Sequence, residues 1–297
     1  IKDYSGRWRW NMVNDFRPQS IEYSGIKCYP TANYVNYYGM QNGYPINDMT
    51  KADAESGYDP THPWKNRDPR FYKTIMFDGV KWKSTGGAGG TAELFTGGRE
   101  SEEANEKKGC FTAYMNSKLC PQLMNTVDGY KENNIMILSL MRLADVYLMY
   151  AEATAVGYNG PKGKAATYSL TAEEALNKIR ERAGVAPVLD KFLGSTADFL
   201  SELRRERAVE LSFEGFRFID LRRWMLLTQY PYTLKTKIEF DRADPSDYNY
   251  DEPEENAIKN LREVVLLERK YTDRHYWYPL PKKDVSMYEG FYQNPGW

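Results

Sequence analysis

The chain has 297 residues, enough for one large domain or two modest ones around a substantial buried core. Its 40 basic and 41 acidic residues give a formal net charge of −1, and no block rich in Lys and Arg stands out. Binding a nucleic-acid duplex requires a basic face that displaces phosphate counterions, so we expect no nucleic-acid partner. No apolar run reaches the ~20 residues of a membrane helix. The chain starts at Ile1 with neither Met nor a signal segment, as expected of a processed chain or a fragment.

Tyrosine is frequent, with 24 Tyr against 12 Phe. The tyrosine ring combines an apolar face with a polar edge at low entropic cost, which suits a surface that binds a hydrated ligand such as a sugar. The same composition is typical of a scaffold whose tyrosine hydroxyls cap buried polar groups. Composition alone leaves both interpretations open.

The three cysteines, Cys28, Cys110 and Cys120, have no metal-like spacing. A bridge between Cys110 and Cys120 stays open beside the simpler interpretation of reduced, partly buried thiols. The two histidines, His62 and His275, stand far apart in sequence and offer little material for a metal site or a catalytic pair.

Residues 1–138 are rich in Gly, Pro, Asn and aromatics, which predicts a loop-rich region with short elements. We expect a short helix over Thr31–Tyr38 and short extended segments over Arg70–Phe77 and Phe111–Cys120. The sequence GGAGG and a charged run predict a flexible, solvated loop over Lys83–Gly109.

Residues 139–227 have a strongly helical pattern. Two successive helices here resemble a tetratricopeptide (TPR) unit, although the connection Gly157–Leu170 is too long for a regular repeat. A single helix pair cannot bury both of its faces, so we expect another part of the protein to pack against it. Three- and four-residue spacing in the first helix predicts one buried stripe that consists of Leu140, Leu143, Tyr147, Tyr150 and Thr154.

The next two helices carry capping signals. Thr171 followed by Glu174 is a capping box, and Gly184 is expected to end that helix. A third helix is expected to begin near Ser195 or Thr196.

Residues 228–297 return to a loop-rich closing segment. Asp241–Asn256 is acidic, and Asn260–Leu267 is compatible with a helix or a strand. Tyr276–Pro281 reads as an extended segment fixed by two prolines.

The third expected helix, which is rich in charged residues, is the strongest candidate for a catalytic site. Glu206, Glu210 and Glu214 follow one another at four-residue spacing, with Arg207 and Arg217 close by. Paired carboxylates serve as acid and base in glycosidases, but those two groups flank the scissile bond from opposite sides. Carboxylates on one stripe beside arginines favour permanently ionised, structural groups.

We predict no cofactor. Asp247–Asp251 has alternate oxygen ligands like the start of a calcium loop, but Glu252 stands where glycine is required and Ile258 where glutamate is required. An irregular calcium site stays as a lesser hypothesis.

Several short motifs together resemble the SusD/RagB family of Bacteroidetes outer-membrane lipoproteins, and their order covers the chain from about residue 30 to its end. They are Asn66–Phe71 with Thr74-Ile75 and Asp78-Gly79, Leu143–Leu148 with Tyr150–Ala153, Ile179–Gly184, Glu206-Arg207 with Glu210-Leu211, Phe213–Gly215, Arg217 and Asp220–Trp224, Tyr278–Pro281, and Gln293–Trp297.

The resemblance implies a mainly α fold, with TPR-like helix pairs packed against a loop-rich region that contains short β-segments. It implies a non-enzymatic protein on the extracellular face of the outer membrane, held by an N-terminal lipid anchor that this chain does not contain. The implied partners are a glycan and a SusC-like TonB-dependent transporter. Family members also have an N-terminal TPR half, which we take to be absent from this chain, so the chain corresponds to a C-terminal portion.

The resemblance also places the ligand in a shallow groove with an aromatic arc, and no catalytic or metal-binding residue is implied. The alternative for the two tryptophans among the candidates is that they fill the core. The candidate ligand-binding residues are Trp64, Tyr44, Tyr38, Tyr37, Trp82, Asn42 and Asn66.

The leading hypothesis is capture of an oligo- or polysaccharide and its delivery to the transporter. A second is peptide capture, as in RagB-like importers. Two further hypotheses are a glycoside hydrolase with Glu210 or Glu214 catalytic, and a helical protein-interaction module.

Overall fold

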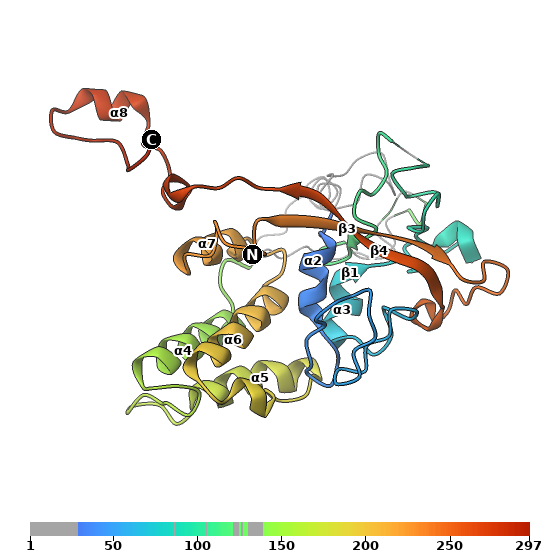
Figure 1. Ribbon diagram of the computed structural model, residues 1–297, viewed down its shortest axis with the longest axis horizontal. Coiled ribbons are helices and arrows are strands. Elements are labelled where there is room, and N and C mark those ends of the chain that lie inside the picture. Colours follow the sequence, from blue (N-terminus) through green and yellow to red (C-terminus); the bar gives the residue numbers. More distant parts are fainter. Residues whose placement is uncertain (1–28, 86, 105, 121–124, 126, 130–138) are drawn as a thin grey trace.

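The computed structural model describes residues 29–85, 87–104, 106–120, 125, 127–129 and 139–297, and Cys28 lies outside them. The fold is mainly α, as predicted, with short strands (Figure 1). The elements of the first region are α2 (Ala32–Val35), η1 (Asn36–Tyr38), α3 (Pro69–Thr74), β1 (Ile75–Met76), η2 (Gly87–Gly90) and β2 (Met115–Asn116). The later elements are α4 (Leu143–Gly157), α5 (Ala172–Ala183), η3 (Asp190–Phe192), α6 (Thr196–Glu210), α7 (Phe216–Arg223), β3 (Leu234–Arg242), η4 (Pro253–Glu255), β4 (Ile258–Glu268), η5 (Asp273–Tyr276) and α8 (Lys282–Met287).

Helices α4, α5 and α6 gather on one side of the molecule (Figure 1) and share an apolar cluster. The capping box before α5 is confirmed, since the Thr171 hydroxyl accepts from the Glu174 N–H at 3.2 Å and the Glu174 carboxylate accepts from the Thr171 N–H at 2.7 Å. Ser195 caps α6 by accepting from the Asp198 N–H at 3.0 Å. Both predicted helix starts are therefore correct.

The predicted buried stripe of α4 was wrong at its start and correct at its end, since Thr154 is buried and Tyr147 and Tyr150 are half-buried against the core. Leu140 precedes the helix and is 94% exposed, and Leu143 is 66% exposed. The buried face also carries Asp145, Leu148 and Ala151, which the prediction did not include. Asp145 pairs with a buried arginine of α6, and this ion pair fixes the rotation of a helix that is apolar on both sides.

Tyr150 anchors the long connection between α4 and α5 with its side chain. The Tyr150 hydroxyl donates to the Leu170 carbonyl at 2.6 Å and accepts from the Ala165 N–H at 3.3 Å. The ring of Tyr150 packs edge-on against Tyr168. The connection that is too long for a regular TPR repeat is thus packed against α4 through Tyr150.

Two expectations in the first region were also wrong. Arg70–Phe77 is not extended throughout, because Asp68 caps the Arg70 N–H at 2.9 Å and Pro69 occupies the first turn of α3. Lys83–Gly109 is not simply a solvated loop, because Thr91, Ala92 and Leu94 are buried in it.

A long antiparallel ribbon, β3–β4, crosses the molecule (Figure 1). Asn260–Leu267 lies in its second strand. Alternate residues of β3, Thr236, Ile238 and Phe240, face the core, whereas most of β4 is exposed. The C-terminal segment projects beyond the ribbon, where the Trp297 indole donates to the Arg274 carbonyl at 2.9 Å.

The main core lies between the first region and β3, and it takes up three of the candidate ligand residues. Trp64 is 0% exposed and stacks on Phe77 with ring centroids 5.0 Å apart. Tyr38 is buried and donates to the Ser212 hydroxyl at 2.8 Å, and Trp82 is also buried. This burial corrects their placement on a ligand surface, because no ring face is left for a sugar.

Replacing Trp64 with alanine tests its core role. We expect Trp64→Ala to lower the free energy of unfolding by about 3–5 kcal/mol, because it leaves a large cavity. The measurement is urea unfolding followed by circular dichroism. The control Trp277→Ala, at a ring that is 55% exposed, should change stability by no more than about 0.5 kcal/mol. A stable Trp64→Ala protein that had lost saccharide binding would contradict the core assignment.

Candidate ligand-binding site

A shallow groove of about 400 Å³ brings together two of the predicted residues, Asn42 and Asn66. We call it the amide groove, and it is lined by Met40, Gln41, Asn42, Ser56, Gly57 and Asn66. Side-chain amides both donate and accept hydrogen bonds, which matches the dual character of sugar hydroxyls.

Backbone pairing positions the groove. The Met40 N–H donates to the Tyr44 carbonyl at 2.9 Å and closes a turn. The Gln41 N–H donates to the Asn66 carbonyl at 2.9 Å and joins this turn to the 66–67 segment. Within the turn, the Asn42 amide donates to the Ser56 carbonyl at 2.9 Å and accepts from the Tyr44 N–H at 3.2 Å.

Arg67 lies beneath the groove as a buried support. Its guanidinium donates to the carbonyls of Gly39, Pro63 and Val35 at 3.0, 2.9 and 3.1 Å. These bonds satisfy backbone acceptors that would otherwise be orphaned in the core. Arg67 is therefore a structural residue of the core.

Asn66 is the most available polar group of the groove. Its side chain is exposed and makes no hydrogen bond to the described part of the chain. Its φ of 55° lies in the left-handed region, which asparagine tolerates better than most residues. Asn66 can therefore offer its whole amide to a ligand.

The two remaining candidates, Tyr44 and Tyr37, are half-buried and do not line the amide groove. The Lys191 ammonium lies 4.4 Å from the Tyr44 ring centre and pairs with Glu55 at 3.1 Å. Tyr37 lines a separate depression. The expected aromatic arc is not assembled at this groove.

Sequence reasoning missed Met40, Gln41, Ser56 and Gly57 as lining residues. The Asn42-Gly43 turn was a signal for Gln41, since a neighbour in a tight turn shares its surface. Ser56 and Gly57 reach the groove through a bridge between Asp53 and Tyr58, which no local pattern indicates.

The carboxylates of the charged helix are held in a buried ion-pair network. Glu206 pairs with Arg70 and Arg180, and Glu210 accepts from Arg182 at 2.7 Å and from Arg70 at 2.9 Å. Burial alone would raise the pKa of the Glu206 carboxyl, but Arg70 and Arg180 outweigh it and lower that pKa to about 2.

Glu214 lies beyond the end of α6 and pairs with Lys118 at 2.6 Å and Arg142 at 2.8 Å. Burial opposes ionisation, but Arg142 and Lys118 outweigh it and lower the pKa of this carboxyl. Groups that stay ionised and paired are poor proton donors at neutral pH. The partners come from other elements rather than from the neighbouring Arg207 and Arg217.

No group of three or more His, Cys, Asp and Glu in the described residues is arranged to hold a metal ion. In the loop tested for calcium, the Asn249 side chain instead accepts from the N–H groups of Asp251 and Glu252. Cys110 and Cys120 are both buried and form no disulfide with each other.

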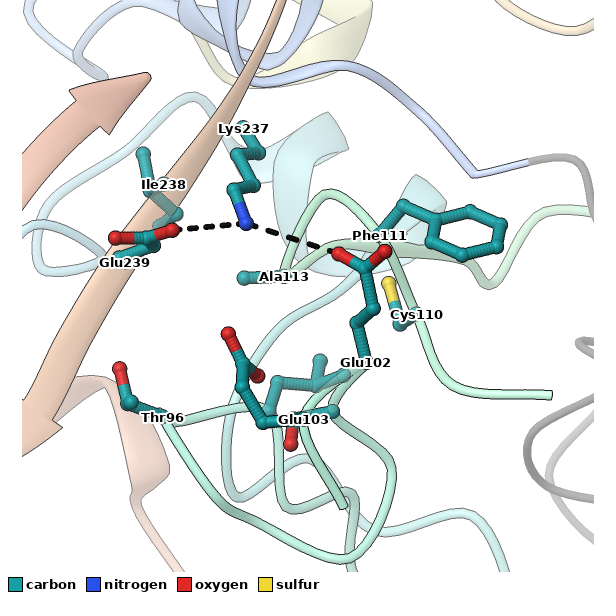
Figure 2. A pocket seen from close by; sticks show the side chains of 11 residues that line it. Thr96, Glu102, Glu103, Cys110, Phe111, Ala113, Lys237, Ile238 and Glu239 are labelled. Atoms are coloured by element: carbon teal, nitrogen blue, oxygen red, sulfur yellow. Dashed lines mark ion pairs between the residues drawn. The ribbon is translucent and has the colours of Figure 1, made fainter. Parts of the chain in front are cut away.

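A much smaller pocket, of about 10 Å³, lies where β3 meets the 101–113 segment. Figure 2 shows the Lys237 ammonium between the carboxylates of Glu239 at 2.8 Å and Glu102 at 3.7 Å. A space of this size holds about one water molecule. It is a surface ion-pair cluster and not a ligand site.

The described residues form a helical scaffold with a shallow surface groove lined in part by side-chain amides. The SusD family matches residues 1–297, and the chain belongs to the SusD family. A search of curated proteins found no match. No helix in the described part of the chain has the length and apolarity of a bilayer span.

Two solved structures from Bacteroides fragilis are similar to this chain. One, a SusD-like protein, has 22% sequence identity and a TM-score of 0.63, with 91% of this chain and 47% of that chain covered. The other, a SusD-like carbohydrate binding protein, has 19% identity and a TM-score of 0.53, with 86% and 47% covered. At these identities the likeness concerns the fold, and the chain spans less than half the length of either protein.

The charged network predicts a loss of stability in acid. The Glu206 pKa is about 2 in the folded chain against an ordinary 4.5, so between these values the unfolded chain binds more protons. The contribution of Glu206, about 3 kcal/mol, is present above about pH 4.5 and is lost as pH falls through about 2. Urea unfolding between about pH 6 and about pH 2, a range that covers both pKa values, measures this loss.

Two variants sharpen this measurement. Glu206→Gln should lower stability at neutral pH by about 3–5 kcal/mol, because it leaves buried arginines short of a partner, and should flatten the acid slope. Glu268→Gln, at an exposed end of β4, should keep the wild-type slope. If the stability of Glu206→Gln fell with pH as steeply as that of the wild type, Glu206 would not be the source of the acid sensitivity.

Proposed function

We propose that this chain is part of a non-enzymatic protein that captures an oligo- or polysaccharide at the outer-membrane surface. The observation that carries the proposal is membership of the SusD family over residues 1–297. The carbohydrate binding named for one of the similar structures supports the ligand class. The paired state of Glu206, Glu210 and Glu214 favours binding without turnover.

The amide groove is the proposed contact surface. Asn66 and Gln41 offer amides to sugar hydroxyls, and the exchange of water for such bonds favours specificity more than affinity. A shallow groove also admits a long chain at any point along its length. Because the relatives are about twice as long, we propose that the remaining part of the protein adds further contacts to the same ligand.

We further propose that the protein is lipid-anchored at the extracellular face and delivers its ligand to a SusC-like TonB-dependent transporter. In that longer protein a TPR-like half would pack on the outer face of α4. Support comes from the exposed apolar residues of that face, whose helical spacing leaves a continuous stripe of Leu143, Val146, Met149 and Val156.

Calorimetry with the full-length protein tests the ligand class against panels of neutral oligosaccharides, polysaccharides and peptides. We expect saccharide binding without release of shorter products, and the same absence of turnover in Glu214→Gln. Peptide binding with no saccharide binding would replace the proposal by peptide capture. Saccharide cleavage that disappears in a folded Glu214→Gln protein would establish a hydrolase.

A substitution that respects the backbone tests the groove. Asn66→Gly removes the amide while glycine accepts the positive φ, and we expect about threefold to tenfold weaker saccharide binding. The matched control is Asn159→Gly in the α4–α5 connection, also at a positive φ of 64° and exposed. Equal affinities of the two variants would remove the amide groove from the binding surface.

A further inference from the structure

A second depression, of about 170 Å³, lies near the turn that forms the amide groove. We call it the arginine pocket. Its lining residues include the aromatic Tyr37, Phe192 and Tyr232, the arginines Arg204, Arg205 and Arg217, and one acid, Glu202. It therefore combines flat apolar faces with positive charge.

The positive charge of the arginine pocket is only partly neutralised. Arg205, at its edge, is satisfied by Glu202 at 2.8 Å and by the carbonyls of Tyr37 and Gly43. Glu202 is already shared with the buried Arg180. The Glu202 carboxylate thus pairs with two guanidinium groups, those of Arg180 and Arg205, and does not pair with Arg204 or Arg217.

Arg217 and Arg204 have no carboxylate partner among the described residues. The Arg217 guanidinium lies 4.9 Å from the Tyr37 ring centre and 5.5 Å from that of Tyr232, and it donates one hydrogen bond to the Tyr37 hydroxyl at 3.0 Å. Its other N–H groups have no partner in the described part of the chain. Arg204 likewise only stacks, 5.4 Å from the Trp224 ring centre. These two guanidinium groups therefore keep N–H donors that could bind an anionic group.

Two further cationic side chains, Lys235 and Arg269, interact electrostatically with each other, and Lys235 also does so with Arg217. Lys235 follows Tyr232 closely in sequence, and Arg269 is fixed by its N–H bond to the Thr233 carbonyl at 2.9 Å. Burial, together with the nearby charges of Arg269 and Arg217, lowers the pKa of the Lys235 amine to about 8. Neither Lys235 nor Arg269 pairs with a carboxylate of the described residues. The folded chain bears this repulsion without compensation.

We propose that the arginine pocket binds the carboxylate or sulfate group of an acidic sugar. Arg217 and Arg204 donate to the oxyanion, and the Tyr37 and Tyr232 rings flank the sugar ring. The pocket is smaller than the roughly 300–1,000 Å³ typical of drug-sized ligands, so it takes a single residue of a glycan. The inference rests on the proposed saccharide binding and narrows its ligand class to acidic glycans.

Binding of glucuronate and galacturonate to the full-length protein, each compared with its neutral methyl ester, tests the proposal by NMR titration. We expect the acids to bind about tenfold more tightly than the esters, with the difference shrinking as salt screens the charges. Arg217→Gln and Arg204→Gln should each remove most of the difference. Arg262→Gln, on exposed β4, is the matched control and should retain it.

The Lys235 amine supplies a readout that a purely structural role would not move. Its pKa, about 8 in the free chain, should rise when an acidic sugar binds and stay unchanged with the ester. Equal binding of acid and ester, or an unchanged difference in both Arg217→Gln and Arg204→Gln, would overturn the proposal. So would inorganic sulfate that binds as tightly as the acidic sugars, because no sugar ring would then be recognised. If neutral oligosaccharides bind while acids gain nothing, only this inference fails; if no saccharide binds, the proposed function fails as well.

Discussion

The ion pairs of helix α6 hold the rest of the structure in place. Glu206 joins Arg70 of α3 and Arg180 of α5, and Arg207 joins Asp145 of α4 and Asp220 of α7. Each charge is removed from water, which is costly unless every partner is present and well oriented. The requirement for complete pairing therefore constrains four helices relative to one, more strictly than apolar contact alone would.

This constraint reaches the amide groove through a short stretch of chain. Asp68, which caps α3, also pairs with Arg70 at 2.7 Å, and Arg70 is held in turn by Glu206. Asn66 and Arg67 lie directly before this cap. The groove is thus attached to the buried ion-pair network, which would lower the cost of ordering it around the ligand that we propose.

Sequence reasoning succeeded where a signal was local. The capping box at Thr171 and the N-cap at Ser195 fixed two helix starts because the bonds involved span three residues. It failed for the first turn of α4, since the residues on both faces are apolar and Asp145 is turned inward by an arginine distant in sequence. At the site, the polar candidates Asn42 and Asn66 met in one groove, whereas Trp64 was drawn into the core by Phe77 and β3.

The Gly39–Pro45 turn contributes residues to both depressions. A side chain at Gly39 would approach the Tyr44 carbonyl to 2.6 Å and the Arg205 guanidinium to 2.8 Å, so the turn closes this tightly only around glycine. Arg205 braces the turn beside the arginine pocket, while the pairing of Gln41 with residue 66 braces it beside the amide groove. Since Tyr38, Trp64 and Trp82 are buried, the ligand surface that we propose lies on the two sides of this braced turn, where hydroxyls would be recognised on one side and charge on the other.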